Sequence, residues 1–194
     1  MAEDFEARYR AGDAPWDIGR PQGAIVRLAE AGEIRGQVLD VGCGTGENAL
    51  HLAALGRPVL GIDLSQTAIA AAQAKAAERG LQASFRVHDA LLLSKLRRRF
   101  ETVIDVGFFH TLSNEQRRPY AQSLCEACSS GSVLHILCFS DEEPEGPGPR
   151  RVPEYDLRST FRSLFALVRI EPAVFEAKRP EGDAKAWLAT LNCV

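Results

Sequence analysis

The residues best suited to chemistry lie where an apolar stretch gives way to a run of glycines. Residues 38–46 read Val-Leu-Asp-Val-Gly-Cys-Gly-Thr-Gly, and a helical pattern begins directly afterwards at Glu47. A strand, a tight glycine turn and a helix N-terminus let a backbone approach a nucleoside closely. The pattern therefore predicts a nucleoside-binding turn built on Asp40, Gly42, Cys43, Gly44 and Gly46.

The spacing of these glycines argues against a phosphate-containing ligand. A dinucleotide fingerprint reads G-x-G-x-x-G, whereas here the order is G-x-G-x-G and Glu47 occupies the place of the third glycine. A negative side chain at that position disfavours a pyrophosphate on the helix N-terminus. The chain also lacks a G-x-x-x-x-G-K-[ST] motif, so neither NAD, FAD nor a nucleoside triphosphate is favoured.

Three acidic residues end successive strand-like segments. Asp63 ends the second segment, where a carboxylate can accept hydrogen bonds from both hydroxyls of a ribose. Asp89 ends the third, in a place suited to an adenine amino group, and Asp40 lies where a cationic group of the ligand would fall. S-Adenosylmethionine combines adenosine, a sulfonium and an amino acid without any phosphate, and it fits these three acids.

Strand and helix patterns alternate five times from residue 38 onward, which predicts a parallel, doubly wound α/β sheet with helices on both faces. We expect two final strands to form an antiparallel hairpin around a Pro-Glu-Gly-Asp turn. The expected strands are 38–41, 58–62, 83–87, 101–106, 132–139, 166–177 and 184–193. The expected helices are 3–10, 23–34, 47–55, 66–79, 91–98, 114–128 and 156–165. Segments 11–22 and 140–153 are broken by proline and glycine and are expected to be loops.

Composition is that of an ordinary globular chain. The 194 residues, 45% of them hydrophobic, suffice for one domain over 1–194 without a metal or disulfide to hold it together. A net charge of −3 gives no reason to expect a nucleic-acid partner, and no apolar run approaches the roughly 18 residues of a membrane span. An odd number of cysteines, five, without a secretory signal predicts free thiols, no metal site and a cytoplasmic protein.

The motifs together resemble the class I S-adenosylmethionine-dependent methyltransferases. The resemblance rests on the glycine turn, on Gly61-Ile-Asp-Leu-Ser65, on His88-Asp89-Ala90 and on residues 100–110, with Glu101 standing where the family usually has Asp. It implies a three-layer Rossmann-like fold with seven strands, the last antiparallel. It also implies a cofactor site that includes Asp40, Gly42, Cys43, Gly44, Gly46, Asp63, Leu64, Asp89, Ala90 and Asp105.

A narrower resemblance is to the thiopurine methyltransferase-like group, which includes halide and thiol methyltransferases. It rests on residues 14–22, on Asp105 with Phe108-Phe109, and on Gly146-Pro-Gly-Pro149. The resemblance implies that residues 1–22 form a lid over the cofactor and the acceptor, and that 140–155 form a cover loop. Trp16 and Arg20 would then belong to the site, with Arg20 a candidate for the cofactor carboxylate and Tyr9 a weaker candidate for a second aromatic.

Methyl transfer needs alignment, exclusion of water and, for some acceptors, removal of a proton. His110, with an ordinary pKa near 6.5, is the candidate general base; alternatively it only orients a loop or packs against the following helix. Phe108 and Phe109 would form an apolar wall for the acceptor, although one of them could equally be part of the core. Arg150 and Arg151 would bind an anionic acceptor, cover the entrance or lie in solvent.

The leading hypothesis is therefore transfer of a methyl group from S-adenosylmethionine to a small-molecule thiol or hydroxyl. One alternative is a natural-product methyltransferase that acts on O or N of a phenol or quinone. Another is a protein that binds the cofactor without transferring a methyl group. A monomer and a homodimer are both compatible with the sequence.

Overall fold

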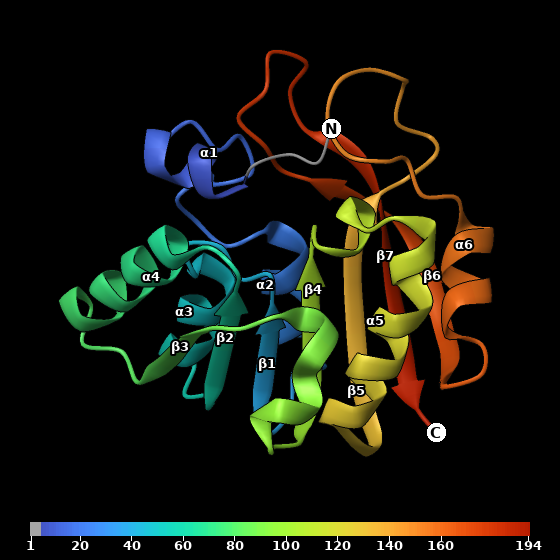
Figure 1. Ribbon diagram of the computed structural model, residues 1–194, viewed down its shortest axis with the longest axis horizontal. Helices are drawn as coiled ribbons and strands as arrows, with labels where there is room; N and C mark the ends of the chain where they lie inside the picture. Colours follow the sequence, from blue (N-terminus) through green and yellow to red (C-terminus); the bar gives the residue numbers. More distant parts are fainter. Residues whose placement is uncertain (1–4) are drawn as a thin grey trace.

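A computed structural model describes residues 5–194, whose strands form one sheet in the order β3-β2-β1-β4-β5-β7-β6 (Figure 1). Strands β1 to β5 pair in parallel, whereas β7 is antiparallel to both β5 and β6. The predicted seven-stranded α/β fold with an antiparallel last strand is confirmed. The strands are β1 (Val38–Val41), β2 (Val59–Asp63), β3 (Ala83–Val87), β4 (Phe100–Val106), β5 (Cys128–Phe139), β6 (Phe165–Phe175) and β7 (Ala184–Cys193).

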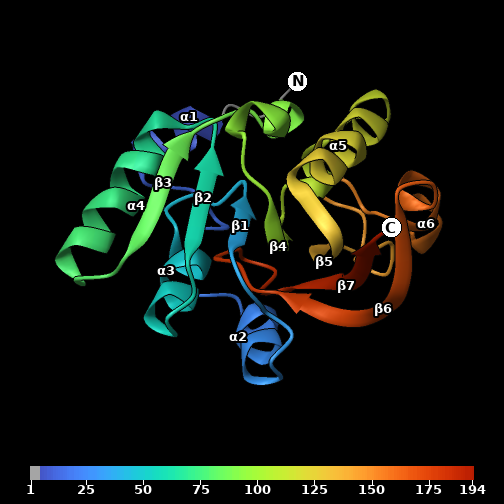
Figure 2. The same ribbon diagram turned by 90° about the horizontal axis from the view of Figure 1, so that it is seen from below.

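Helices cover both faces of the sheet and give it three layers (Figure 2). One face packs against α5, α6 and the 3₁₀ helix η1, and the other against α2, α3 and α4. A short first helix lies outside these layers, above α4 (Figure 1). The helices are α1 (Phe5–Ala11), α2 (Gly23–Glu30), α3 (Glu47–Ala54), α4 (Gln66–Glu78), η1 (Ala90–Leu96), η2 (Phe109–Thr111), α5 (Asn114–Ala127) and α6 (Glu154–Phe161).

Side-chain alternation explains how the strands fill both layers. Leu39 and Val41 of β1 point into the core beneath α5, whereas Val38 points into the core beneath α2 and α3. All three are buried because helices cover both faces of a parallel sheet. The buried strands therefore read as continuous apolar runs, which is why their positions could be predicted.

Element boundaries follow local signals with a few exceptions. The Ser65 side chain accepts a hydrogen bond from the Ala68 N–H, so Ser65 caps α4 as expected. The predicted strand 132–139 begins earlier, at Cys128, because Cys128 pairs with Phe100 of β4. The helix expected at 156–165 ends at Phe161, since Phe165 already pairs with β7. Residues 3 and 4 of the first expected helix lie outside the described residues.

Over residues 5–194, the structure contains no helix with both the length and the apolar character that crossing a bilayer requires.

A substitution at Gly61 in β2 would show how tightly side chains pack against the sheet behind the glycine turn. A Cβ atom at this position would lie 2.6 Å from Phe85 Cδ1 and 2.9 Å from Cys43 Sγ. We expect Gly61→Ala to lower the free energy of unfolding by about 1–3 kcal/mol, because neither neighbour can withdraw without disturbing the core. Chemical denaturation measures this, with Gly146→Ala as the control.

Gly146 is a suitable control because the nearest atom to its Cβ position is Arg151 Nη2, at 3.5 Å. The change there should stay within about 0.5 kcal/mol. Equal stability of the two variants would show that the contact at Gly61 is not tight.

Candidate active site

A cavity of about 710 Å³ opens at the carboxyl ends of the strands. The glycine turn and the end of β2 line one side, and the ends of β4, β5 and β6 line the other. The N-terminal segment and the loops around 147–149 and 177–179 complete its walls. Ligands of open α/β sheets bind at this edge, so the cavity is the candidate active site.

Backbone geometry at the glycine turn leaves no room for side chains. Gly44 has φ +54°, and a Cβ atom there would lie 2.5 Å from the Tyr9 hydroxyl. Gly46 has φ +86°, and its Cβ would meet Phe85 and Ala72 within 2.9 Å. Gly42, Cys43, Gly44 and Gly46 all line the cavity. Their contact with the cofactor stays a prediction.

Asp63 ties the glycine turn to the end of β2. Its carboxylate accepts hydrogen bonds from the Gly44 N–H at 2.9 Å and from the Ser65 N–H at 2.8 Å. Each carboxylate oxygen has a further lone pair, so the group can still accept bonds from a ribose. The next side chain, Leu64, is 64% exposed and lines the cavity, where it offers an apolar surface to a base.

Asp40 and Asp105 do not reach the cavity wall. Both are buried beneath the turn, and neither oxygen of Asp40 has a hydrogen-bond partner among the described residues. Burial, with the charges of Asp105 and Asp63, raises the pKa of Asp40 well above its ordinary value. The prediction that both contact the cofactor is therefore corrected: neither carboxyl lines the cavity, and the raised pKa favours the uncharged form of Asp40.

Asp105 instead supports the loop that follows β4. Its carboxylate accepts hydrogen bonds from the Phe108 N–H, the Phe109 N–H and the Tyr120 hydroxyl. Complete burial raises the pKa of Asp105 to about 6. These bonds determine where Phe108 and His110 stand at the cavity.

Asp89 begins η1, where its side chain accepts a hydrogen bond from the Leu91 N–H at 2.9 Å. Its other oxygen has no donor within residues 5–194, so it remains available to an amino group. The neighbours His88 and Ala90 line the cavity, whereas Asp89 itself lies just behind them.

An aromatic cluster in the N-terminal segment covers the glycine turn. Trp16 Nε1 donates a hydrogen bond to the Tyr9 hydroxyl at 2.7 Å, and the Trp16 ring packs edge-on against Phe5 and Tyr9. Glu6 joins α1 to the start of α4, because its carboxylate accepts hydrogen bonds from the hydroxyls of Ser65 and Thr67. These bonds lower the pKa of Glu6 to about 2.

Arg20 lies at the cavity but already has an anionic partner. Its guanidinium binds Glu176 at 2.9 Å, and Glu176 also accepts the Gly23 N–H. Gln22 exchanges two hydrogen bonds with the Glu176 backbone. This pairing, which joins Arg20 to the residue after β6, uses only Nη1 of the guanidinium, so binding of the cofactor carboxylate by Arg20 stays a prediction.

The acceptor side of the cavity is mainly aromatic. Phe108, Phe139 and Phe175 line it, whereas Phe109 is fully buried and packs against Phe161. The predicted role of Phe109 in binding the acceptor is therefore wrong, because η2 turns its ring into the core. Phe108 keeps its predicted place.

His110 lines the cavity and packs against Phe139 and Phe175. The Phe139 N–H donates a hydrogen bond to Nδ1 at 3.0 Å, so the neutral ring carries its proton on Nε2. Burial, with the charge of Arg151, lowers the pKa of His110 to about 3. The expected general base is corrected to a hydrogen-bond donor, because Nδ1 is occupied and Nε2 already holds a proton.

The two predicted arginines after the proline loop do not line the cavity. Arg150 binds the Asn114 side chain, and Arg151 binds the backbone carbonyls of Pro144 and Pro149. Both side chains thus make contacts within the protein and lie outside the cavity lining. Arg179, which sequence reasoning missed, lines the cavity instead.

Phe139, Phe175 and Arg179 are the functional candidates that sequence reasoning overlooked. Phe139 ends β5, so the rule that selected the acids at other strand ends could have found it. Phe175 and Arg179 belong to the β6–β7 hairpin, whose approach to the cavity has no local signal.

Comparison with known proteins decides the family. A family model described as a methyltransferase domain matches residues 38–131. A 2-heptyl-1-hydroxyquinolin-4(1H)-one methyltransferase of Mycobacteroides abscessus is 38% identical over 183 residues, covering 89% of this chain and 81% of the relative. The chain belongs to the S-adenosylmethionine-dependent methyltransferases.

Further matches agree with this family. A solved structure from a study of the conversion of a disulfide bond into a thioacetal group during echinomycin biosynthesis has a TM-score of 0.89 and 42% identity. The match covers 100% of this chain and 93% of the other. A probable thiol methyltransferase 2 of Arabidopsis thaliana is 30% identical over 151 residues, covering 76% of this chain and 66% of the relative.

The methyltransferase uses S-adenosylmethionine, and its residues fit that cofactor. The turn at Gly44 admits no side chain, and Asp63 keeps free lone pairs that can accept hydrogen bonds from a ribose. Glu47 binds Lys75 and Arg79, so its charge is balanced within the protein. The absence of the third glycine, rather than repulsion by Glu47, is the stronger argument against a dinucleotide.

Asp63 provides a direct test of the cofactor site. We expect Asp63→Asn to weaken binding of S-adenosylmethionine by about 1–3 kcal/mol, because the amide cannot accept on both sides as the carboxylate does. Isothermal titration calorimetry measures this. Glu154→Gln, which removes an exposed carboxylate paired with Arg158 on α6, should leave the affinity unchanged; an unaffected Asp63→Asn would refute the placement.

His110 should leave a signature in the pH dependence of stability. Below about pH 6.5 the unfolded chain protonates this histidine, whereas the folded chain does so only near its pKa of about 3. The free energy of unfolding should therefore fall with decreasing pH by about 1.4 kcal/mol per unit from this residue. His110→Gln should reduce the slope of stability against pH between 6 and 4 by about one proton, measured by urea denaturation; an unchanged slope would contradict the burial of a neutral ring.

Proposed function

We propose that this methyltransferase acts on a small planar aromatic molecule through an ionised heteroatom, a hydroxyl or a thiol. An acidic hydroxyl on a heteroaromatic ring fits best. Phe108, Phe139 and Phe175 offer apolar surfaces of the right kind for a ring. The proposal depends most on one observation, the hydrogen bond that the Phe139 N–H donates to Nδ1 of His110.

Without a general base, the acceptor must be nucleophilic when it binds. His110 presents a proton on Nε2, and burial together with Asp63 raises the pKa of Tyr9 above its ordinary value, so Tyr9 also keeps its proton. Neither group can remove a proton from the acceptor at neutral pH. An acceptor that ionises by itself, such as an acidic hydroxyl or a thiol, needs no such help.

Charge balance supports the same conclusion. As the acceptor lone pair forms a bond to the methyl carbon, the carbon–sulfur bond breaks, and the negative charge of the acceptor cancels the positive charge of the sulfonium. No proton has to move during this step. The protein's task is then to align the acceptor, exclude water and hold both charges before they cancel.

Residues of this chain can be assigned to these tasks. Gly44, Asp63 and Leu64 would hold the adenosine part, with Asp89 near the base and the buried Asp40 and Asp105 below the cationic part. Trp16 and the rest of the segment up to residue 22 would act as a lid. Residues 140–155 would cover the acceptor, since Pro147 and Pro149 line that side of the cavity.

Relatives favour two acceptor chemistries. The Mycobacteroides abscessus relative is named for a hydroxyquinolinone, a planar ring with a hydroxyl, and the Arabidopsis thaliana relative is named for thiols. Both acceptor types ionise readily, as the site requires. Methylation of an amine or of a weakly acidic phenol is the less favoured alternative, because each would profit from a base.

The pH dependence of the reaction tests the proposal. We expect kcat/KM to rise with pH to a plateau whose midpoint follows the ionisation of the acceptor, not of an enzyme group. Phenols substituted to ionise at different pH should shift the midpoint correspondingly, with turnover followed by mass spectrometry. A midpoint near pH 6.5 for every acceptor would instead identify a titrating histidine and overturn the proposal.

A further inference from the structure

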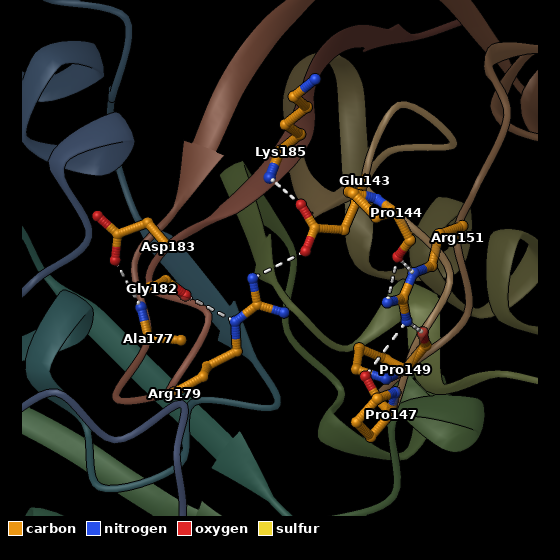
Figure 3. A network of polar contacts seen from close by, with 10 residues as sticks. All are labelled: Glu143, Pro144, Pro147, Pro149, Arg151, Ala177, Arg179, Gly182, Asp183 and Lys185. Carbon is orange, nitrogen blue, oxygen red and sulfur yellow. Dashed lines mark hydrogen bonds and ion pairs between the residues drawn. The ribbon is translucent and has the colours of Figure 1, made fainter.

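An ion pair joins two loops that border the acceptor side of the cavity (Figure 3). Arg179 in the β6–β7 hairpin binds Glu143, which follows β5, at 2.8 Å. Glu143 also accepts a hydrogen bond from the Lys185 N–H at 2.8 Å. The two side chains are only 14% and 9% exposed, which is unusual for charged groups between loops.

Arg179 is held in one orientation by three contacts. Its Nε donates to the Gly182 carbonyl at 2.7 Å, its Nη2 binds Glu143, and its guanidinium lies 5.3 Å from the centre of the Phe139 ring. Nη1 has no hydrogen-bond partner among residues 5–194, as the undashed nitrogen in Figure 3 shows. A fixed guanidinium at the cavity wall with an unused nitrogen is equipped to bind an oxygen.

Two nitrogen donors lie beside one aromatic ring of the cavity wall. His110 carries its proton on Nε2, and His110 and Arg179 both pack against Phe139. Arg151 also lies over Phe139, and Glu143 is already paired with Arg179. The side chains around Phe139 thus include two hydrogen-bond donors suited to an oxygen.

We propose that Arg179 selects the acceptor by binding a second oxygen of it, one conjugated with the heteroatom that receives the methyl group. In such an acceptor the negative charge is shared between the two ends of the conjugated ring system. Arg179 holds the far end, so the near end stays free to react. Glu143 acts as a positioning residue that orients the guanidinium.

This assignment rests on the proposed function, and it narrows the substrate class to ionised hydroxy- or mercapto-aromatics with a conjugated oxygen. 4-Nitrophenol is a suitable probe, because it ionises near neutral pH and its anion places charge on the nitro oxygens. 4-Nitroanisole has the same ring but is neutral. The ratio of their affinities reports recognition of the anion.

Binding is measured by calorimetry with protein saturated with S-adenosylhomocysteine, at a pH where 4-nitrophenol is ionised. The wild type should prefer 4-nitrophenolate to 4-nitroanisole, and Arg179→Gln should weaken phenolate binding about tenfold or more while hardly changing the anisole. Arg158→Gln is the control: its guanidinium pairs with Glu154 on α6 and does not line the cavity. It should keep the preference. Equal preferences in the two variants would overturn the assignment.

A second variant separates recognition from loosening of the loops. Arg179→Gln leaves Glu143 without its cation, whereas the double variant Arg179→Gln/Glu143→Gln removes both charges. Phenolate binding should remain weak in the double variant. Recovery of the wild-type preference there would mean that the unpaired Glu143, not the lost donor, caused the effect.

Turnover distinguishes failure of this inference from failure of the proposed function. Arg179→Gln should lower kcat/KM for 4-nitrophenol about tenfold or more but leave thiophenol, which has no second oxygen, nearly unchanged. Equal losses on both acceptors would overturn the inference and leave the function intact. The wild type could instead bind the phenolate in an Arg179-dependent way but methylate neither acceptor. That result would overturn the proposed methylation of ionised aromatic acceptors and still support the assignment of Arg179 as an anion-binding residue.

Discussion

The hydrogen bond from the Gly44 N–H to the Asp63 carboxylate is the contact on which the site depends. It joins the turn after β1 to the end of β2, so that the backbone and the carboxylate face one cavity. The bond requires a left-handed residue at position 44, and the absence of a side chain there lets the Tyr9 hydroxyl approach the turn. The turn and the N-terminal segment therefore meet at one glycine.

A second set of contacts, centred on the buried carboxylate of Asp105, positions the cavity wall that follows β4. Asp105 holds the backbone of Phe108 and Phe109, and this fixes the short helix that carries His110. The Phe139 N–H then determines which nitrogen of His110 is protonated. A histidine whose type suggests a base becomes a donor because a neighbouring strand occupies its other nitrogen. This single bond is the basis for the proposal that the acceptor ionises unaided.

Much of the fold could be predicted because its signals are local. The apolar strands, the serine cap of α4 and the glycine turn each depend on a few neighbouring residues. That the ends of β1 and β2 border one cavity could be predicted for the same reason, since parallel strands bring their carboxyl ends to one edge. Predictions failed for Phe109, Arg150 and Arg151. Which way a side chain leaves an irregular segment depends on distant partners such as Phe161 and Asn114.

The sequence by itself determined the sheet, the glycine turn and the chemistry of the cofactor, because spacing along the chain carries these features. Only the tertiary structure decided which nitrogen of His110 carries the proton. It also decided that Asp40 and Asp105 are buried behind the cavity wall and that Arg179 lines the cavity. Those outcomes depend on burial and on hydrogen bonds between residues far apart in the chain, such as the 36 positions that separate Arg179 from Glu143. Local sequence has no means to encode where such partners meet.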